Sequence, residues 1–389
     1  MKGASYLNKR VESMIYADNA ATTKLDEDAF KAMKPYLTSE YGNASQPYIF
    51  ARSAKKALAA ARECIASCIG AEPEEIYFTS GGTESDNWAI KGSAFGDAER
   101  RATITSQIEH HAVLNSCKSI ECLGYPVIYL PVTEKGIIEP KKLNHCITDK
   151  TRLVSIMLAN NEIGTIEPIE ELAKIAHEHG ALFHTDAVQA VGHIPINVKK
   201  LGIDILSASA HKFNGPKGIG FLYIKKGTQI TPFNNGGNQE FGMRAGTENV
   251  ASIVGMATAL TNNIEKMDFN RAHITFLENL LLNELNGFDY TKNGDTHHLP
   301  GNISLSFRNV YGETILHRMD LKKICISTGS ACDNVNTQIS HVIKAIKVPK
   351  QYAKGTIRIS LGKDNTKEEI IEIANALKEI VFKGNQATK

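Results

Sequence analysis

Several polar groups with the types and spacing needed for chemistry follow apolar runs of the sequence. Lys212 lies in a loop of small residues and glycines, where a lysine can serve as a Schiff-base nucleophile. Asp186 ends an apolar run, where a carboxylate needs a partner or solvent. Residues 80–83, Ser-Gly-Gly-Thr, precede a predicted helix and offer backbone N–H groups to a phosphate. His110 and His111 follow another such run.

Each group also has a purely structural interpretation. Ser80 or Thr83 could be an ordinary helix cap, Asp186 could cap the helix after it, and Lys212 could be a solvated loop lysine. One cofactor accounts for all three groups together. Pyridoxal phosphate needs a lysine for attachment, an acidic partner for its pyridine nitrogen and an anion cradle for its phosphate. The joint occurrence therefore favours a pyridoxal phosphate site.

Alternating strands and helices are expected to position these groups. Between residues 75 and 224, apolar runs predict seven strands, which begin at Ile76, Thr103, Val127, Leu153, Ala181, Ile203 and Gly220. Helical spacing appears between them, for example from Ile169 to Ala176, with Pro168 before and Gly180 after it. This alternation predicts an α/β fold with a mostly parallel sheet, and ligands bind at the carboxyl ends of such strands.

The pattern changes after Ala257. A long helical stretch runs toward Gly287, strands are expected around Ile303 and Ile357, and a capping box, Thr-x-x-Glu at 366–369, opens the last helix. We expect a large cofactor-binding domain over residues 15–257 and a smaller α+β domain over residues 258–382. Residues 1–14 are expected to join the smaller domain, and residues 383–389 to form a polar tail.

Composition excludes several classes of protein. The 389 residues include 44 basic and 42 acidic side chains, a balance that gives no electrostatic footprint for nucleic acid. No apolar stretch approaches the roughly 20 residues of a membrane span, and the N-terminus lacks the apolar core of a signal peptide. Seven cysteines without repeated spacing indicate reduced thiols and a cytoplasmic protein. The thirteen histidines form no complete ligand set, so no metal is expected.

Ordered motifs span nearly the whole chain. They are Ala-Asp-Asn-Ala-Ala-Thr-Thr at 17–23, Thr-Ser-Gly-Gly-Thr-Glu-Ser at 79–85, Asn-Asn-Glu-Ile-Gly at 160–164, His-Thr-Asp-Ala-Val-Gln at 184–189, His-Lys at 211–212, Gly-Met-Arg-Ala-Gly-Thr at 242–247 and Ser-Thr-Gly-Ser-Ala-Cys at 327–332. In these motifs the sequence resembles the cysteine desulfurases of the NifS/IscS-like branch of the class V aminotransferases. The resemblance implies the transferase fold type I of pyridoxal phosphate enzymes.

The resemblance also implies a role for each matching residue. Lys212 would hold pyridoxal phosphate and move protons, Asp186 would pair with the ring nitrogen, and His110 would stack on the ring as an acid–base group. The remaining cofactor contacts would come from Gln189 to the ring oxygen, from Asn161, and from Gly82, Thr83, Ser209 and His211 to the phosphate. Thr247 would reach the phosphate of the neighbouring subunit in a homodimer. Substrate would contact Asn43, Asn161 and Arg358, whose guanidinium suits a carboxylate.

Cys332 would be the sulfur acceptor. It would take sulfur from L-cysteine as a persulfide, leave L-alanine, and pass the sulfur to an acceptor or scaffold protein for iron–sulfur cluster assembly or thio-modification. Its small polar neighbours suit an exposed loop, whereas the other six cysteines are interpreted as structural. Alternatives are a selenocysteine lyase, another class V aminotransferase or a non-catalytic scaffold. Residues 42–48 and 333–340 depart from the family pattern, which leaves the substrate entrance and the acceptor open.

Overall fold

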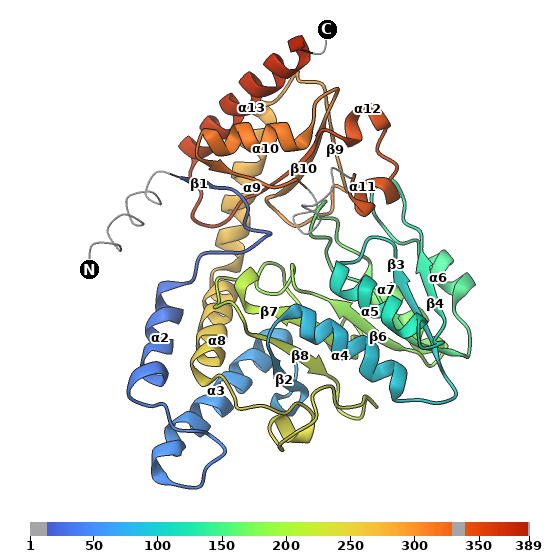
Figure 1. The fold of residues 1–389 in the computed structure, drawn as a ribbon, viewed down its shortest axis with the longest axis vertical. Coiled ribbons are helices and arrows are strands. Elements are labelled where there is room, and N and C mark those ends of the chain that lie inside the picture. The colour runs from blue at the N-terminus through green and yellow to red at the C-terminus, as the bar shows by residue number, and fades with distance from the viewer. Residues whose placement is uncertain (1–13, 329–338, 388–389) are drawn as a thin grey trace.

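The computed structural model describes residues 14–328 and 339–387 (Figure 1). Its main sheet has the strand order β2-β8-β7-β6-β5-β3-β4, in which β8 is antiparallel to both neighbours and the other pairings are parallel. The strands are β2 Ile76–Thr79, β3 Ala102–Ser106, β4 Val127–Leu130, β5 Thr151–Ser155, β6 Leu182–Asp186, β7 Ile205–Ser209 and β8 Gly220–Ile224. The predicted seven-stranded, mostly parallel sheet is confirmed.

Helices cover both faces of this sheet because its strands are apolar on both sides. On one face, Trp88 and Val113 pack against Leu153, and they come from α4 (Gly82–Phe95) and α5 (His111–Glu121). On the other face, Val154 and Phe183 belong to the largest core cluster. The helices that contribute to that cluster include α3 (Arg52–Ile69), α6 (Pro140–Cys146), α7 (Ile169–Glu178) and α8 (Val250–Glu265).

One edge of the sheet collects the strand ends that precede the predicted site residues. Since β2 and β7 are both antiparallel to β8, they run in the same direction as β3 and β6. Thr79, Ser106, Asp186 and Ser209 are the last residues of these four strands. All four segments therefore deliver their following loops to the same edge, where ligands bind in folds of this kind.

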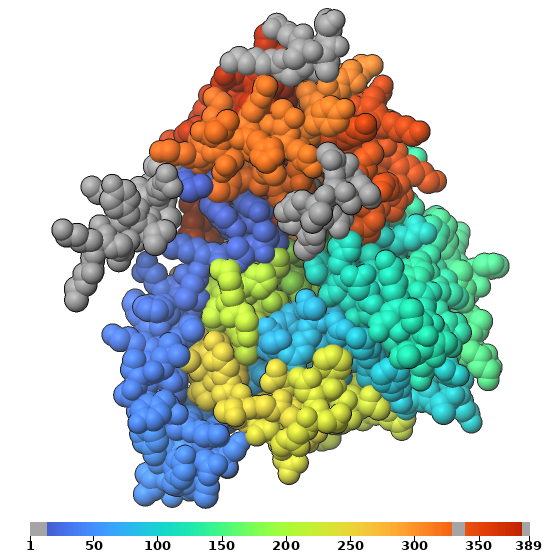
Figure 2. All heavy atoms as spheres, viewed as in Figure 1, coloured from blue at the N-terminus to red at the C-terminus, as the bar shows by residue number. Residues whose placement is uncertain are grey.

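A second hydrophobic core forms the smaller part, seen at the top of Figures 1 and 2. It contains the antiparallel sheet β12-β10-β9 and three long helices. The elements of this part are α9 Met267–Glu284, β9 Tyr290–Lys292, β10 Asn302–Phe307, α10 Gly312–Leu321, β11 Ile324–Cys325, β12 Thr356–Ser360 and α13 Lys367–Ala387. The short helices α11 (His341–Ala345) and α12 (Lys350–Ala353) contribute Val342, Ile343 and Ala353 to the large core instead. The large part also contains α2 (Glu27–Thr38), which packs against α8.

Helix α8 runs across residue 257, the expected end of the large domain. It continues to Glu265 and contributes Met256 and Leu260 to the large core, while α9 contributes Ile274 and Leu277 to the second core. The domain bounds stay a prediction. Strand β1 (Ile15–Tyr16) pairs with β11 in the smaller part. Figure 2 shows the blue N-terminal segment lying against the orange one.

The last helix begins where the sequence predicts and extends further than expected. The Thr366 N–H donates to Glu369 Oε2 at 3.0 Å, and the Glu369 N–H donates to Thr366 Oγ1 at 3.3 Å, which completes the capping box. Helix α13 continues to Ala387, into the segment expected to be a polar tail. Among the described residues, no helix is long and apolar enough to cross a membrane.

Candidate active site

A cavity of about 560 Å³ opens at the edge of the sheet identified above. Its wall combines the start of α4, the loops after the parallel strands, Arg358 of β12 and His341 of α11. Most of the predicted site residues line it: Gly82, Thr83, His110, Asn161, Asp186, Gln189, Ser209, His211, Lys212 and Arg358. The structure therefore brings together residues that are far apart in the sequence.

Lys212 is held at the cavity by main-chain acceptors. It ends a single 3₁₀ turn, η3 (Ala210–Lys212), directly after β7. Its Nζ donates to the carbonyl oxygens of Ala20 at 2.5 Å and Ala21 at 2.8 Å. The side chain is half-buried, so Lys212 is not the solvated loop lysine of the structural interpretation.

Asp186 is a buried carboxyl group at the end of β6. Its Oδ1 accepts the Val188 N–H at 2.9 Å, and a turn rather than a helix follows, so Asp186 does not cap a helix. Burial raises its pKa to about 6, while the Val188 hydrogen bond and the charge of Lys212 oppose that rise. A carboxylate in this position suits a cationic ring nitrogen.

The start of α4 offers an uncapped set of backbone N–H groups. Gly81 is the N-cap residue and provides no side-chain hydrogen bond, so neither Ser80 nor Thr83 caps the helix. Gly81 has a φ of 146°, which favours glycine, and a Cβ on Gly82 would lie 2.6 Å from Val188 Cγ2. Free N–H groups at a helix start bind phosphate well.

The remaining predicted phosphate ligands lie beside this helix start. Ser209 ends β7, and its Oγ would be 3.4 Å from a Cβ on Gly81. His211 Nδ1 lies 3.2 Å from Thr22 Oγ1, and burial with the charge of Lys212 lowers the pKa of His211 to about 4. The imidazole of His211 is therefore neutral, and it can donate one hydrogen bond to an anion.

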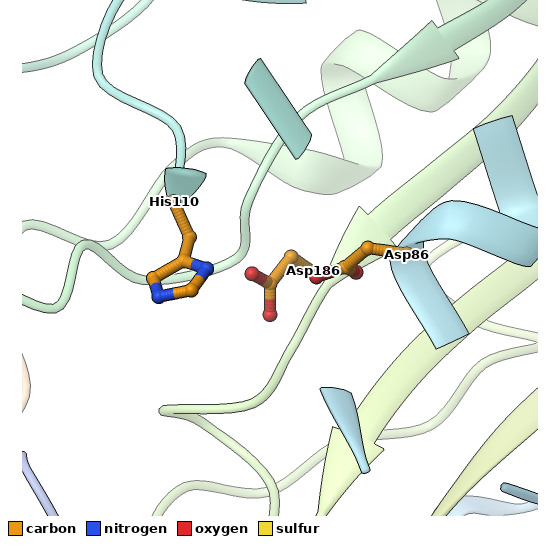
Figure 3. Close-up of side chains that lie close together, drawn as sticks. All are labelled: Asp86, His110 and Asp186. Atoms are coloured by element: carbon orange, nitrogen blue, oxygen red, sulfur yellow. The ribbon is translucent and has the colours of Figure 1, made fainter. Parts of the chain in front are cut away.

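His110 points into the cavity beside Asp186 (Figure 3). Its Nδ1 accepts the Ala112 N–H at 3.1 Å, so the neutral ring carries its proton on Nε2. Burial first, then the nearby charges of Lys212 and His111, lower the pKa of His110 to about 4. His110 is thus neutral near pH 7, with a donor available at Nε2.

Arg358 lies on β12 and closes the cavity from the smaller part. Its terminal nitrogens donate to Asn161 O at 2.9 Å and to Asp18 Oδ1 at 2.8 Å. Within residues 14–328 and 339–387, the Arg358 Nε has no hydrogen-bond partner although it is buried. A substrate carboxylate would supply the missing acceptor.

Two predicted residues do not line this cavity, and a third lies outside the described part of the chain. Thr247 is exposed and does not line it. Asn43 does not line it either, and Asn43 Oδ1 accepts the Ser45 N–H at 2.9 Å. Cys332 lies outside the described residues. The roles of all three remain predictions from the family resemblance.

The cavity wall also contains residues that the sequence patterns did not single out: Asp86, Met157, Glu162 and His341. Asp86, His110 and Asp186 each place one potential metal-ligand atom within 4.8 Å of the others. Two of the three, His110 and Asp186, are the predicted partners of the cofactor ring, so a bound ring would account for the convergence of these two. The sequence contains one indication that Asp86 is buried, because it precedes the apolar residues Trp88, Ala89 and Ile90 of the same helix.

Comparisons with known proteins agree with this fold and site. Residues 15–373 match the family described as "Aminotransferase class-V". A protein of Dictyoglomus turgidum named cysteine desulfurase IscS is 50% identical over 373 residues, which are 95% of each chain. A solved structure titled "NIFS-LIKE PROTEIN" has a TM-score of 0.90 and 38% identity, over 95% of this chain and 99% of that chain.

A further solved structure is titled "SspA in complex with cysteine". It has a TM-score of 0.80 and 36% identity, over 90% of this chain and 100% of that chain. The family resemblance and the type I fold expected from the motifs are both confirmed. With 50% identity over nearly its full length, the chain belongs to the class V aminotransferase family, in the branch of the NifS- and IscS-like cysteine desulfurases.

Proposed function

We propose that this cysteine desulfurase binds pyridoxal phosphate at Lys212, removes sulfur from L-cysteine and transfers it to Cys332, releasing L-alanine. The observation that carries the proposal is the meeting of Lys212, Asp186 and the uncapped start of α4 in one cavity. These are the three requirements of the cofactor: a lysine, an acid and an anion cradle. The solved relative in complex with cysteine supports the choice of substrate.

The residues present fit the cofactor. Pyridoxal phosphate, when bound, supplies an electron-withdrawing ring for the reacting carbon of the substrate. Lys212 would attach it, and ionised Asp186 would hold a proton at the ring nitrogen. The first N–H groups of α4, with Ser209 and His211, would bind the phosphate. Gln189 Nε2 already donates to Ala20 O at 3.0 Å, which fixes the side chain that would face the ring oxygen.

Proton movement would fall to Lys212 and His110. Lys212 Nζ is held at the carbonyl oxygens of Ala20 and Ala21, so its amine stays within the cavity when it is not attached. His110 presents Nε2 because its Nδ1 is engaged by the Ala112 N–H. The two groups therefore offer an amine and an imidazole at defined positions.

The described residues on either side of Cys332 support its assignment as sulfur acceptor. Before it, Ser327 and Arg358 exchange backbone hydrogen bonds of 3.0 and 2.6 Å. After it, Ser340 Oγ donates to Glu162 Oε2 at 2.6 Å, and His341 Nε2 donates to Glu109 O at 3.0 Å. Arg358, Glu162 and His341 line the cavity, so the described residues that precede and follow the segment with Cys332 are both held by residues of the cavity wall or directly beside it.

Production of L-alanine and sulfide from L-cysteine by the purified yellow protein, with a thiol reductant, tests the proposal. We expect one alanine for each sulfide released. Alanine from L-selenocysteine but none from L-cysteine would replace the proposal with a selenocysteine lyase. The proposal includes transfer of the sulfur from Cys332 to an acceptor protein, for iron–sulfur cluster assembly or thio-modification. It also includes a cytoplasmic location for the enzyme.

Replacing Arg358 with lysine is expected to raise KM for L-cysteine by about 10- to 100-fold, because a lysine cannot supply the fork that binds a carboxylate. The substitution keeps the charge beside Asp18. The visible absorbance of the bound cofactor should be unchanged, and kcat should fall less than KM rises. An unchanged KM with weakened cofactor binding would show that Arg358 is structural.

We also propose a homodimer in which Thr247 contacts the neighbouring subunit's phosphate site. Arg244 forms a fork with Glu84 at the start of α4, with distances of 2.7 and 3.0 Å, so its loop lies beside the phosphate cradle. Exposed Thr247 and the largely exposed Phe241 flank this anchor. Light scattering is expected to show a dimer; a monomer with full cofactor and full activity would refute it.

A further inference from the structure

A second buried carboxyl group lies next to the carboxyl group of Asp186. Asp86 is on α4, 1% of its surface is exposed, and its Oδ1 has no hydrogen-bond partner in the described part of the chain. An oxygen of Asp86 lies within 4.8 Å of an oxygen of Asp186 (Figure 3). Asp186, the predicted partner of the cofactor ring nitrogen, is therefore one member of a close pair of carboxyl groups.

The surroundings of the pair contain little positive charge. His184 on β6 is 3.8 Å from Asp86 Oδ1, but its ring lies between the hydroxyls of Ser155 and Ser207, and burial lowers its pKa to about 3. Glu109, before α5, is a further buried carboxyl, and burial raises its pKa to about 8. His110 is neutral near pH 7, so the cation acting on Asp186 is Lys212.

The two members of the pair differ in the groups that can stabilise a negative charge. Asp186 accepts the Val188 N–H and feels the charge of Lys212. Asp86 has neither and is enclosed within the protein, with Ser207 as its hydrogen-bonding side chain. Two ionised carboxylates at this separation in a buried site oppose each other strongly. One negative charge therefore belongs to the pair, and Asp186 is the better place for it.

We propose that Asp86 is a positioning residue that stays a neutral carboxylic acid, so that the single negative charge of the pair is fixed on Asp186, the member that faces the cofactor ring. Burial, then the proximity of Asp186, raises the pKa of Asp86 well above its usual value, which agrees with this assignment. The proposal rests on the proposed function only in its consequence for the cofactor: Asp86 keeps the ring nitrogen facing one charge rather than two.

The matched variants are Asp86→Asn, Asp186→Asn and Glu167→Gln. Asparagine has the shape of a protonated aspartic acid and keeps a donor, so Asp86→Asn is expected to bind cofactor within about threefold of wild type near neutral pH. Asp186→Asn is expected to bind at least about tenfold more weakly, since it removes the charge itself. Glu167 is the control because it is also buried, has an unpartnered oxygen and a pKa raised to about 8, yet does not line the cavity.

Infrared spectroscopy of the cofactor-free protein reads the proton on Asp86 directly. The carbonyl stretch of a protonated carboxylic acid is expected in wild type near neutral pH and should lose intensity in Asp86→Asn. Glu167→Gln should lose intensity as well but leave cofactor binding and its pH dependence unchanged. On the alkaline side, the pH dependence of the visible absorbance of bound cofactor should differ between wild type and Asp86→Asn, because only wild type keeps a second carboxyl that can ionise beside Asp186.

Two results would overturn the inference. One is an infrared spectrum in which Asp86→Asn loses no carboxylic acid band. The other is a cofactor affinity of Asp86→Asn as low as that of Asp186→Asn, which would mean that Asp86 is ionised. Wild-type protein that binds no cofactor would refute the proposed function instead, and the infrared comparison would still decide the state of Asp86. If Asp86→Asn does not fold, Asp86→Ser keeps a neutral donor and takes its place.

Discussion

Replacing Lys212 with alanine is expected to abolish covalent attachment of the cofactor and to lower turnover of L-cysteine by at least about 10³-fold. Lys212 is the half-buried lysine of the cavity, and its Nζ is held by two carbonyl oxygens at 2.5 and 2.8 Å. The uncapped start of α4 and Asp186 are untouched by the change. The variant should therefore still bind free cofactor, but the visible band of the attached form should disappear.

Borohydride reduction followed by mass spectrometry measures this attachment. The matched control is Lys217→Ala, because Lys217 also lines the cavity but is exposed. We expect the cofactor mass on the Lys212 peptide in wild type and in Lys217→Ala, and no modified lysine in Lys212→Ala. A cofactor mass on Lys217, with activity retained in Lys212→Ala, would contradict the assignment.

Periodicity predicted the strands because each is a short apolar run, but the exact ends depend on tertiary hydrogen bonds. The run that begins at Leu153 was expected to continue as a strand to Leu158, whereas β5 ends at Ser155. Ile156 and Leu158 instead donate their N–H groups to His184 O and Asp186 O, at 3.0 and 2.9 Å. The run stays extended and buried beside β6, so its apolar pattern continues past the end of the regular ladder.

The sequence likewise predicts some of the site residues, whereas others can be recognised only in the tertiary structure. Lys212, Asp186 and the two glycines could be predicted because each follows a strand, and the edge of a parallel sheet collects strand ends. Asp86 could not, because its role depends on Asp186, a hundred residues later in the chain, and on the lack of a neighbouring cation among the described residues. A helical aspartate next to apolar residues indicates burial but not which carboxyl it meets.

Replacing Cys332 with serine is expected to leave cofactor binding intact and to reduce sulfur release from L-cysteine to below about 1% of wild type. A thiol with a reference pKa of about 8.5 is partly ionised near neutral pH, whereas a serine hydroxyl is not. None of the described residues that line the cavity is altered by this change. Loss of sulfur release with an unchanged cofactor spectrum would therefore locate the defect at the sulfur acceptor.

Mass spectrometry after brief exposure to L-cysteine without reductant identifies the acceptor, with Cys325→Ser as the matched control. Cys325 is close in sequence, but it lies on β11, paired with Tyr16 of β1, and burial raises its thiol pKa above the usual value. Burial thus leaves less of the thiolate that would attack the substrate sulfur. An added sulfur on the Cys332 peptide is expected in wild type and in Cys325→Ser. A sulfur confined to Cys325, with full activity in Cys332→Ser, would show that the acceptor is the strand cysteine.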